Sequence, residues 1–128
     1  MDYYISKATN YTFDEAVNKI SSELKEVGFG ILTEIDMKAT LKKKLDVDRR
    51  PYKILGACNP QFANKALSME EKIGILLPCN VLVFENEKGK TEVAIMDPAV
   101  AMSVVENHKL ESLASMVKEK LELALSNI

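Results

Sequence analysis

The chain has 128 residues, 47% hydrophobic and 28% charged, values that are typical of a globular protein and exclude a disordered or fibrous one. Seventeen basic and nineteen acidic residues give a formal net charge of −2, which provides no net attraction for nucleic acid or anionic lipid. Since the sequence has no signal-peptide pattern and no apolar run long enough for a membrane span, we expect a single cytoplasmic domain over residues 1–128, with neither nucleic acid nor membrane as a partner.

The chain begins with a pattern for one strand and one long helix. Residues 3–8 are rich in aromatic and β-branched side chains, which favours a strand. Thr12 and Glu15 have the spacing of a capping box, and apolar residues then recur at helical intervals. The sequence therefore predicts a helix that runs to Gly28, a residue that tolerates the left-handed conformation at a helix end.

Residues 31–38 alternate between apolar and polar side chains, the pattern of a half-buried strand. The alternation predicts that Glu34, Asp36 and Lys38 share one face of this strand. Residues 39–45 are rich in lysine and carry two leucines four residues apart, so a short surface helix is expected next.

The middle of the chain predicts a strand followed directly by a helix. Residues 52–57 form a compact apolar segment, and Asn59 with Pro60 has the pattern of an N-cap followed by proline in the first turn. The helix is expected to continue to about Lys72.

The last third predicts a hairpin and two more helices. Residues 80–85 and 91–96 flank a polar, glycine-containing turn, which is typical of an antiparallel hairpin. Asp97 followed by proline then predicts a short helix over residues 99–105. Leucines and other apolar residues between 110 and 125 fall on one helical face, so a long amphipathic helix is expected at the C-terminal end of this sequence.

Together these elements predict an α+β fold. Two long helices, with short extra helices beside them, would cover one face of a mainly antiparallel sheet. The opposite face would then meet solvent, a ligand or another subunit.

Three segments resemble the domain of unknown function 302 family of uncharacterised bacterial and archaeal proteins. They are Gly28–Leu41 (GFGILTEIDMKATL), Tyr52–Pro60 (YKILGACNP) and Leu76–Val81 (LLPCNV), in the family's order and spacing. The resemblance implies a TATA-binding-protein-like α+β fold and a homodimer, and it implies no established reaction. A shared fold does not imply DNA binding, against which the acidic composition argues.

Cys58 and Cys79 are the candidate catalytic residues. Each is followed by asparagine and lies next to a junction of predicted elements, so the fold could bring them together. A helix that begins after Cys58 would favour its thiolate. The hypothesis is a thiol-dependent enzyme or sulfur-handling protein, with Asn59 and Asn80 as hydrogen-bond donors, and the alternative is that both cysteines are small buried hydrophobic residues.

Polar side chains suggest a second kind of site. Glu34, Asp36 and Lys38 could bind a small polar molecule if their strand face lines a cleft, and Arg50 beside Tyr52 could hold an anionic group against an aromatic wall. The alternatives are a solvated or dimer-facing strand and ordinary loop charges.

We expect neither a metal nor a cofactor. His108 is the sole imidazole and is far in sequence from both cysteines, so ligand pairs with metal-site spacing are missing. The leading interpretation is a homodimeric small-ligand-binding or accessory protein with its pocket near Glu34, Asp36, Cys58 and Cys79. The thiol-dependent enzyme is the rival.

Overall fold

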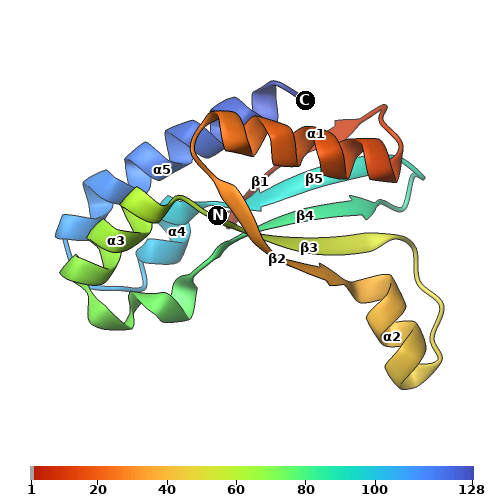
Figure 1. Ribbon diagram of the computed structural model, residues 1–128, viewed down its shortest axis with the longest axis horizontal. Helices are drawn as coiled ribbons and strands as arrows, with labels where there is room; N and C mark the ends of the chain where they lie inside the picture. The colour runs from red at the N-terminus through yellow and green to blue at the C-terminus, as the bar shows by residue number, and fades with distance from the viewer. Residues whose placement is uncertain (1) are drawn as a thin grey trace.

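A five-stranded sheet forms the centre of the molecule (Figure 1). The computed structural model describes residues 2–128. All neighbouring strands are antiparallel, in the order β1-β5-β4-β3-β2. The strands are β1 (Tyr4–Thr9), β2 (Gly30–Asp36), β3 (Tyr52–Cys58), β4 (Cys79–Glu85) and β5 (Thr91–Met96).

Helices separate the strands along the chain, except that a turn joins β4 directly to β5. They are α1 (Phe13–Glu26), α2 (Met37–Leu45), α3 (Pro60–Met69), the 3₁₀ helix η1 (Glu71–Leu76), α4 (Pro98–Met102) and α5 (Lys109–Ser126). The predicted α+β fold with a mainly antiparallel sheet is confirmed, and its likeness to the TATA-binding-protein-like class stays a prediction. Over residues 2–128, no helix combines the length and apolar character that a bilayer span requires.

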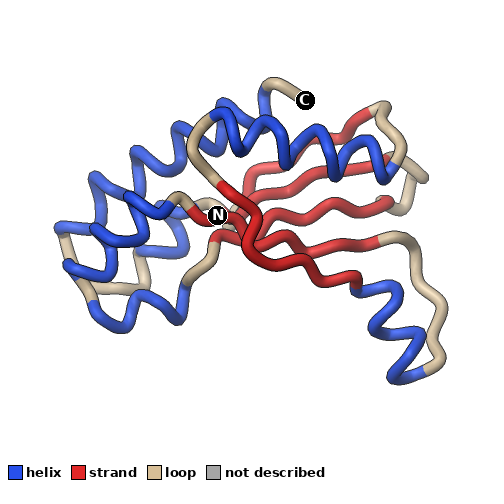
Figure 2. Tube along the Cα trace, in the orientation of Figure 1, coloured by secondary structure: helices blue, strands red, loops and turns tan. Residues whose placement is uncertain are grey.

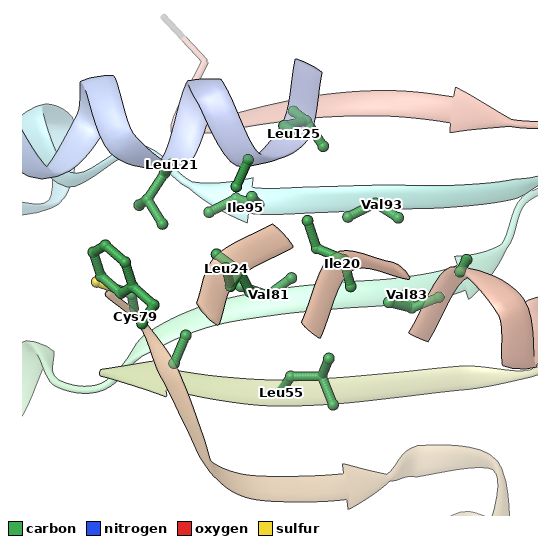
Figure 3. Packing of buried hydrophobic residues seen from close by; sticks show 14 of the residues in the cluster. Ile20, Leu24, Leu55, Cys79, Val81, Val83, Val93, Ile95, Leu121 and Leu125 are labelled. Atoms are coloured by element: carbon green, nitrogen blue, oxygen red, sulfur yellow. The ribbon is translucent and has the colours of Figure 1, made fainter. Parts of the chain in front are cut away.

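The two longest helices, α1 and α5, lie on the same side of the sheet (Figure 1). Between them and the strands lies the main hydrophobic core (Figure 3), where the large, fully buried side chains are Ile20, Leu24, Leu55, Val81, Val83, Val93, Ile95 and Leu121. Each contributing strand sends alternate residues to this side, as the two-residue repeat of a strand requires. The other face of the sheet is thereby left without a long helix over it.

Helix α1 begins as its sequence predicts. The Thr12 side chain accepts a hydrogen bond from the Glu15 amide at 3.2 Å, and the Glu15 carboxylate accepts one from the Thr12 amide at 2.9 Å. These reciprocal bonds satisfy amide groups that would otherwise lack partners at the helix start. Gly28 follows the helix with φ of +92°, a conformation that glycine adopts without a steric penalty.

Strand β2 ends earlier than the alternation predicts. The Asp36 carboxylate accepts a hydrogen bond from the Ala39 amide at 2.9 Å and caps α2, which begins at Met37. The prediction that Lys38 shares a strand face with Glu34 and Asp36 is therefore wrong, because Lys38 lies in the helix. A bulge between Ile31 and Thr33 also shifts the register, so the predicted face of alternating residues is broken.

Helix α2 projects from the end of β2, away from the helical layer (Figure 2). It contains no buried residue. Leu45 at its end and Val47 in the loop beyond it are 66% and 41% exposed. The predicted short, lysine-rich surface helix is confirmed.

The helix predicted to reach Lys72 is shorter than expected. Helix α3 ends at Met69, Glu70 is extended, and η1 then turns Ile73 into a second hydrophobic cluster, where it is 1% exposed. Helix α4 likewise ends at Met102, before the predicted limit. Burial of apolar residues at the end of the sheet sets these boundaries, and helical propensity along the sequence does not report such contacts.

Candidate binding site

The uncovered face of the sheet contains a hollow of about 580 Å³. Side chains from β1, β3, β4 and β5, and from the residue before β1, surround it. The lining residues are Tyr3, Tyr4, Tyr52, Asn80, Leu82, Phe84, Glu92, Ala94, Ile95 and Met96. Its volume lies within the range of small-molecule sites, which is roughly 300–1,000 Å³.

Strand register places the floor and one wall of the hollow. Leu82 on β4 pairs with Ala94 on β5, and because Ala94 carries only a methyl group, the surface is low at this point. Two residues further along β4, Phe84 pairs with Tyr52 on β3 and with Glu92 on β5. An aromatic and acidic row therefore stands beside a small apolar floor, since residues two apart on a strand share a face.

Two pairs of aromatic rings border the hollow. The ring centroids of Tyr3 and Tyr4 are 5.1 Å apart in an edge-to-face arrangement, and those of Tyr52 and Phe84 are 5.5 Å apart and tilted. Burial raises the pKa of the Tyr52 phenol, and the charge of the Tyr3 phenolate raises it further. The pairs come from strands at different positions in the sheet and meet at one hollow.

Two polar side chains complete the lining. The Glu92 carboxylate accepts a hydrogen bond from Asn86 Nδ2 at 3.1 Å, which orients it at the hairpin end of the hollow. Asn80 is exposed on β4. A few fixed polar groups among apolar walls are typical of sites that select a ligand by orientation.

The two cysteines line a different cavity, of about 50 Å³, at the end of the sheet beneath α3, α4 and α5. Other lining residues are mainly apolar and include Phe29, Phe62 and Met102. The structure thus brings Cys58 and Cys79 to one cavity. Cys79 is 7% exposed, and burial, followed by the charge of Cys58, raises its pKa from the ordinary 9.0 to about 11.

The start of α3 does not offer free amide groups to a thiolate in the way the sequence suggests. Asn59 caps the helix, and its Oδ1 accepts hydrogen bonds from the amides of Gln61 and Phe62 at 3.1 and 3.3 Å. The interpretation of Asn59 as a helix cap is confirmed. The predicted stabilisation of a Cys58 thiolate by the helix start loses these two donors.

The remaining predicted site residues lie apart from both the hollow and the cavity. Glu34 forms an ion pair with Lys53 at 2.8 Å, and Asp36 caps α2. Cys58 pairs with Gly30 at one end of the β2–β3 ladder, whereas Asp36 pairs with Lys53 at the other. The structure therefore separates the predicted acidic cluster from the thiols.

The two basic residues among the predicted ligand-binding residues, Lys38 and Arg50, lie outside the hollow. Lys38 Nζ donates a hydrogen bond to the Arg49 carbonyl oxygen at 2.6 Å, and Arg50 is exposed in the loop before β3. Tyr52 lines the hollow, but Arg50 is not among its lining residues. The proposed pairing of Arg50 with Tyr52 around one ligand has no geometric support.

The described part of the chain lacks a cluster of side chains that could bind a metal ion together. Within residues 2–128, no group of three or more histidine, cysteine, aspartate or glutamate side chains could hold a metal ion. The His108 side chain is 98% exposed and lies 3.2 Å from a carboxylate oxygen of Glu111, at the start of α5. His108 thus has the position of a surface residue at a helix start.

The family model described as "Domain of unknown function DUF302" matches residues 5–128. The chain belongs to the DUF302 family. The crystal structure of an uncharacterized conserved DUF302 protein from Bacillus stearothermophilus has the same fold, with a TM-score of 0.93 and 24% sequence identity over 99% of this chain and 98% of that one.

Curated relatives of this DUF302 chain include two proteins named fluoride-specific ion channel FluC 1. Those of Brucella suis biovar 1 (strain 1330) and Brucella abortus biovar 1 (strain 9-941) are both 23% identical to it over 95 residues. The match covers 74% of this chain but only 37% and 35% of those proteins. The DUF302 chain thus spans about a third of the length of these relatives.

Sequence reasoning missed most of the residues that line the hollow in this DUF302 protein. It identified Tyr52 and Asn80, but not Tyr4, Phe84 or Glu92. The available signal was the pair of strands at 80–85 and 91–96, whose alternation places Phe84 and Glu92 away from the buried valines. Their convergence with Tyr4 depends on the position of β1 beside β5, which local patterns do not specify.

Proposed function

We propose that this DUF302 protein binds a small organic molecule in the aromatic hollow and functions as a homodimer. One observation carries the binding proposal: four aromatic rings from Tyr3, Tyr4, Tyr52 and Phe84 border one hollow on an uncovered sheet face. Aromatic side chains lose little conformational freedom on binding and present large apolar surfaces.

Filling the hollow should weaken ligand binding. In Ala94→Phe, a ring replaces the methyl group on the floor, so we expect affinity for a ligand found by native mass spectrometry or fragment screening to fall at least about tenfold. Two-dimensional amide NMR would measure the affinity and report whether the variant keeps its fold.

Ala39→Phe is the control for this variant. Ala39 is exposed on α2 and is not among the lining residues of the hollow. It should bind as the unmodified chain does. Equal affinity in the Ala94 and Ala39 variants, or ligand-induced shifts confined to another surface, would contradict the location of the site.

The homodimer proposal uses the surface formed by β2 and α2. This surface, the β2–α2 surface, is defined by Leu32, Ile35, Leu45 and Val47, which are 67%, 45%, 66% and 41% exposed. The bulge after Ile31 makes extension of the sheet by a second β2 unfavourable, so we propose contact through side chains. A second copy is the proposed occupant, because a twofold axis would place the projecting helix of each copy on the other.

Introducing a charge on this surface should dissociate the dimer. We expect Leu45→Glu and, independently, Ile35→Glu to weaken association at least about 100-fold, since a carboxylate would be buried without a partner. Ile75→Glu is the control, because Ile75 is 83% exposed in η1, outside the β2–α2 surface. Sedimentation velocity measures the outcome. A monomer before substitution, or equal dimerisation in all three variants, would contradict the proposal.

The thiol-dependent alternative has less support from the geometry. The raised pKa of Cys79 keeps its thiol protonated at neutral pH, so Cys79 is a poor nucleophile. A thiol reaction would therefore depend on Cys58, and it stays a prediction.

We propose a cytoplasmic location because both cysteines are free. We carry no transport activity over from the FluC proteins, of which the chain matches only a part.

A further inference from the structure

The charge distribution of the hollow is one-sided. Among the described residues that line it, Glu92 carries the one full charge and none is basic. Its carboxylate is half-buried and receives one hydrogen bond, from Asn86 Nδ2. A single neutral hydrogen bond does not neutralise the charge of a carboxylate, so this anion can still attract a cation.

Aromatic rings border the same space. The faces of tyrosine and phenylalanine rings carry negative electrostatic potential and attract cations that approach within about 6 Å of the ring centre. The Tyr3–Tyr4 and Tyr52–Phe84 pairs supply such rings next to the Glu92 carboxylate. Ring quadrupoles and the carboxylate therefore act in the same direction on a charged ligand.

We infer that the ligand of the aromatic hollow is a small organic cation that carries an ammonium group. This inference rests on the proposed binding function and specifies its ligand class. The ammonium group lies near Glu92 and the rings, and its apolar part lies over the floor formed by Leu82 and Ala94.

Other ligand classes fit the lining less well. An anion would approach Glu92 without any basic partner among the lining residues, and like charges repel. An uncharged apolar ligand would cover Glu92 and remove water from its carboxylate without replacing the lost interactions. A cation offsets that desolvation, and the volume of about 580 Å³ accommodates a small free molecule as a whole.

Choline and its uncharged isostere, in which a tert-butyl group replaces the trimethylammonium group, test the inference directly. The two probes have nearly the same shape, so their difference in affinity reports the charge. We expect choline to bind at least about tenfold more tightly, with amide NMR shifts at Ala94 and Phe84. Vesicles of phosphatidylcholine should not cosediment with the protein, because the proposed ligand is a free molecule.

Substitutions identify the groups responsible. Glu92→Gln should remove most of the preference for choline while retaining the binding of the isostere, and Tyr52→Leu should weaken both probes. Glu87→Gln and Tyr11→Leu are the controls, because both residues are exposed and lie outside the lining. Neither control should change the affinity of either probe.

The possible outcomes separate the two proposals. Equal binding of choline and its isostere in the hollow overturns the cation inference and leaves small-molecule binding intact. A choline preference that persists in Glu92→Gln also overturns it. If neither probe shifts the amide NMR signals of residues in the aromatic hollow, the cation inference is contradicted. If no fragment shifts them either, the proposed binding of a small molecule is contradicted as well.

Discussion

Leu121→Ala should lower the free energy of unfolding by about 2–5 kcal/mol. Leu121 is fully buried between α5 and the sheet, in the same cluster as Leu24 and Ile95 (Figure 3). Its removal loses apolar burial and leaves a cavity, because close-packed neighbours relax only in part. Urea unfolding followed by circular dichroism would measure the change.

Leu123→Ala is the matched control in the same helix. Leu123 is 53% exposed, so its truncation removes the same atoms with little loss of buried contact, and we expect a change within about 0.5 kcal/mol. Alanine is also the better helix former, which acts against any small loss. Equal destabilisation by the two substitutions would show that α5 does not pack on the sheet through the Leu121 face.

The two long helices were the most predictable part of this fold. In α1 and α5, apolar residues at helical spacing identify the buried face, and Ile20, Leu24 and Leu121 lie where this pattern places them. The capping residue Thr12 also identifies the start of α1 from sequence alone. Such signals act over only a few residues, so they are readable without knowledge of the rest of the chain.

Strand β2 shows why alternation alone was insufficient. The bulge at Leu32 changes which side chains share a face, and Asp36 ends the strand by capping α2. Alternation in the sequence continues through both features, because it records residue polarity and not hydrogen-bond register. The predicted grouping of Glu34 with Lys38 therefore failed for a reason that belongs to the backbone.

The aromatic hollow depends on contacts between distant segments. Tyr4 and Phe84 are far apart in sequence, and they border the same hollow because β5 lies between β1 and β4. Individually each looks like an ordinary strand aromatic residue. The three segments that resemble the family contain Tyr52, Asn80 and the two cysteines. They therefore indicated part of the hollow and both thiols, but they do not include Glu92.

The stability of the protein should fall as pH rises between about 9 and 11, and Cys79 should be one measurable cause. The folded state raises the pKa of this thiol from 9.0 to about 11 through burial, followed by the charge of Cys58. Below pH 9 both the folded and the unfolded chains keep the proton, so the group has no effect there. Above pH 9 the unfolded chain releases the proton and the folded chain retains it, so a rise in pH favours unfolding.

The full shift corresponds to about 3 kcal/mol once the pH exceeds both pKa values. Lysine and tyrosine residues titrate in the same range, so the effect of the thiol must be taken as the difference between the unmodified protein and Cys79→Ala. The variant leaves a small cavity and should be about 1 kcal/mol less stable at neutral pH. Its relative stability should then rise above pH 9 and exceed that of the unmodified protein near pH 11.

This crossing would separate two accounts of the buried thiol. If the Cys79 thiol is only a small apolar side chain in the cavity, its removal lowers the stability of the folded protein at neutral pH. At high pH the same thiol lowers stability itself, because its ionised form is unfavourable in the buried site. A thiol that the fold holds as a reactive thiolate has a lowered pKa, so its contribution to stability would rise with pH below about 9 and stay level between pH 9 and 11. Urea unfolding of both chains across this pH range therefore tests whether Cys79 belongs to the packing of the core or to chemistry.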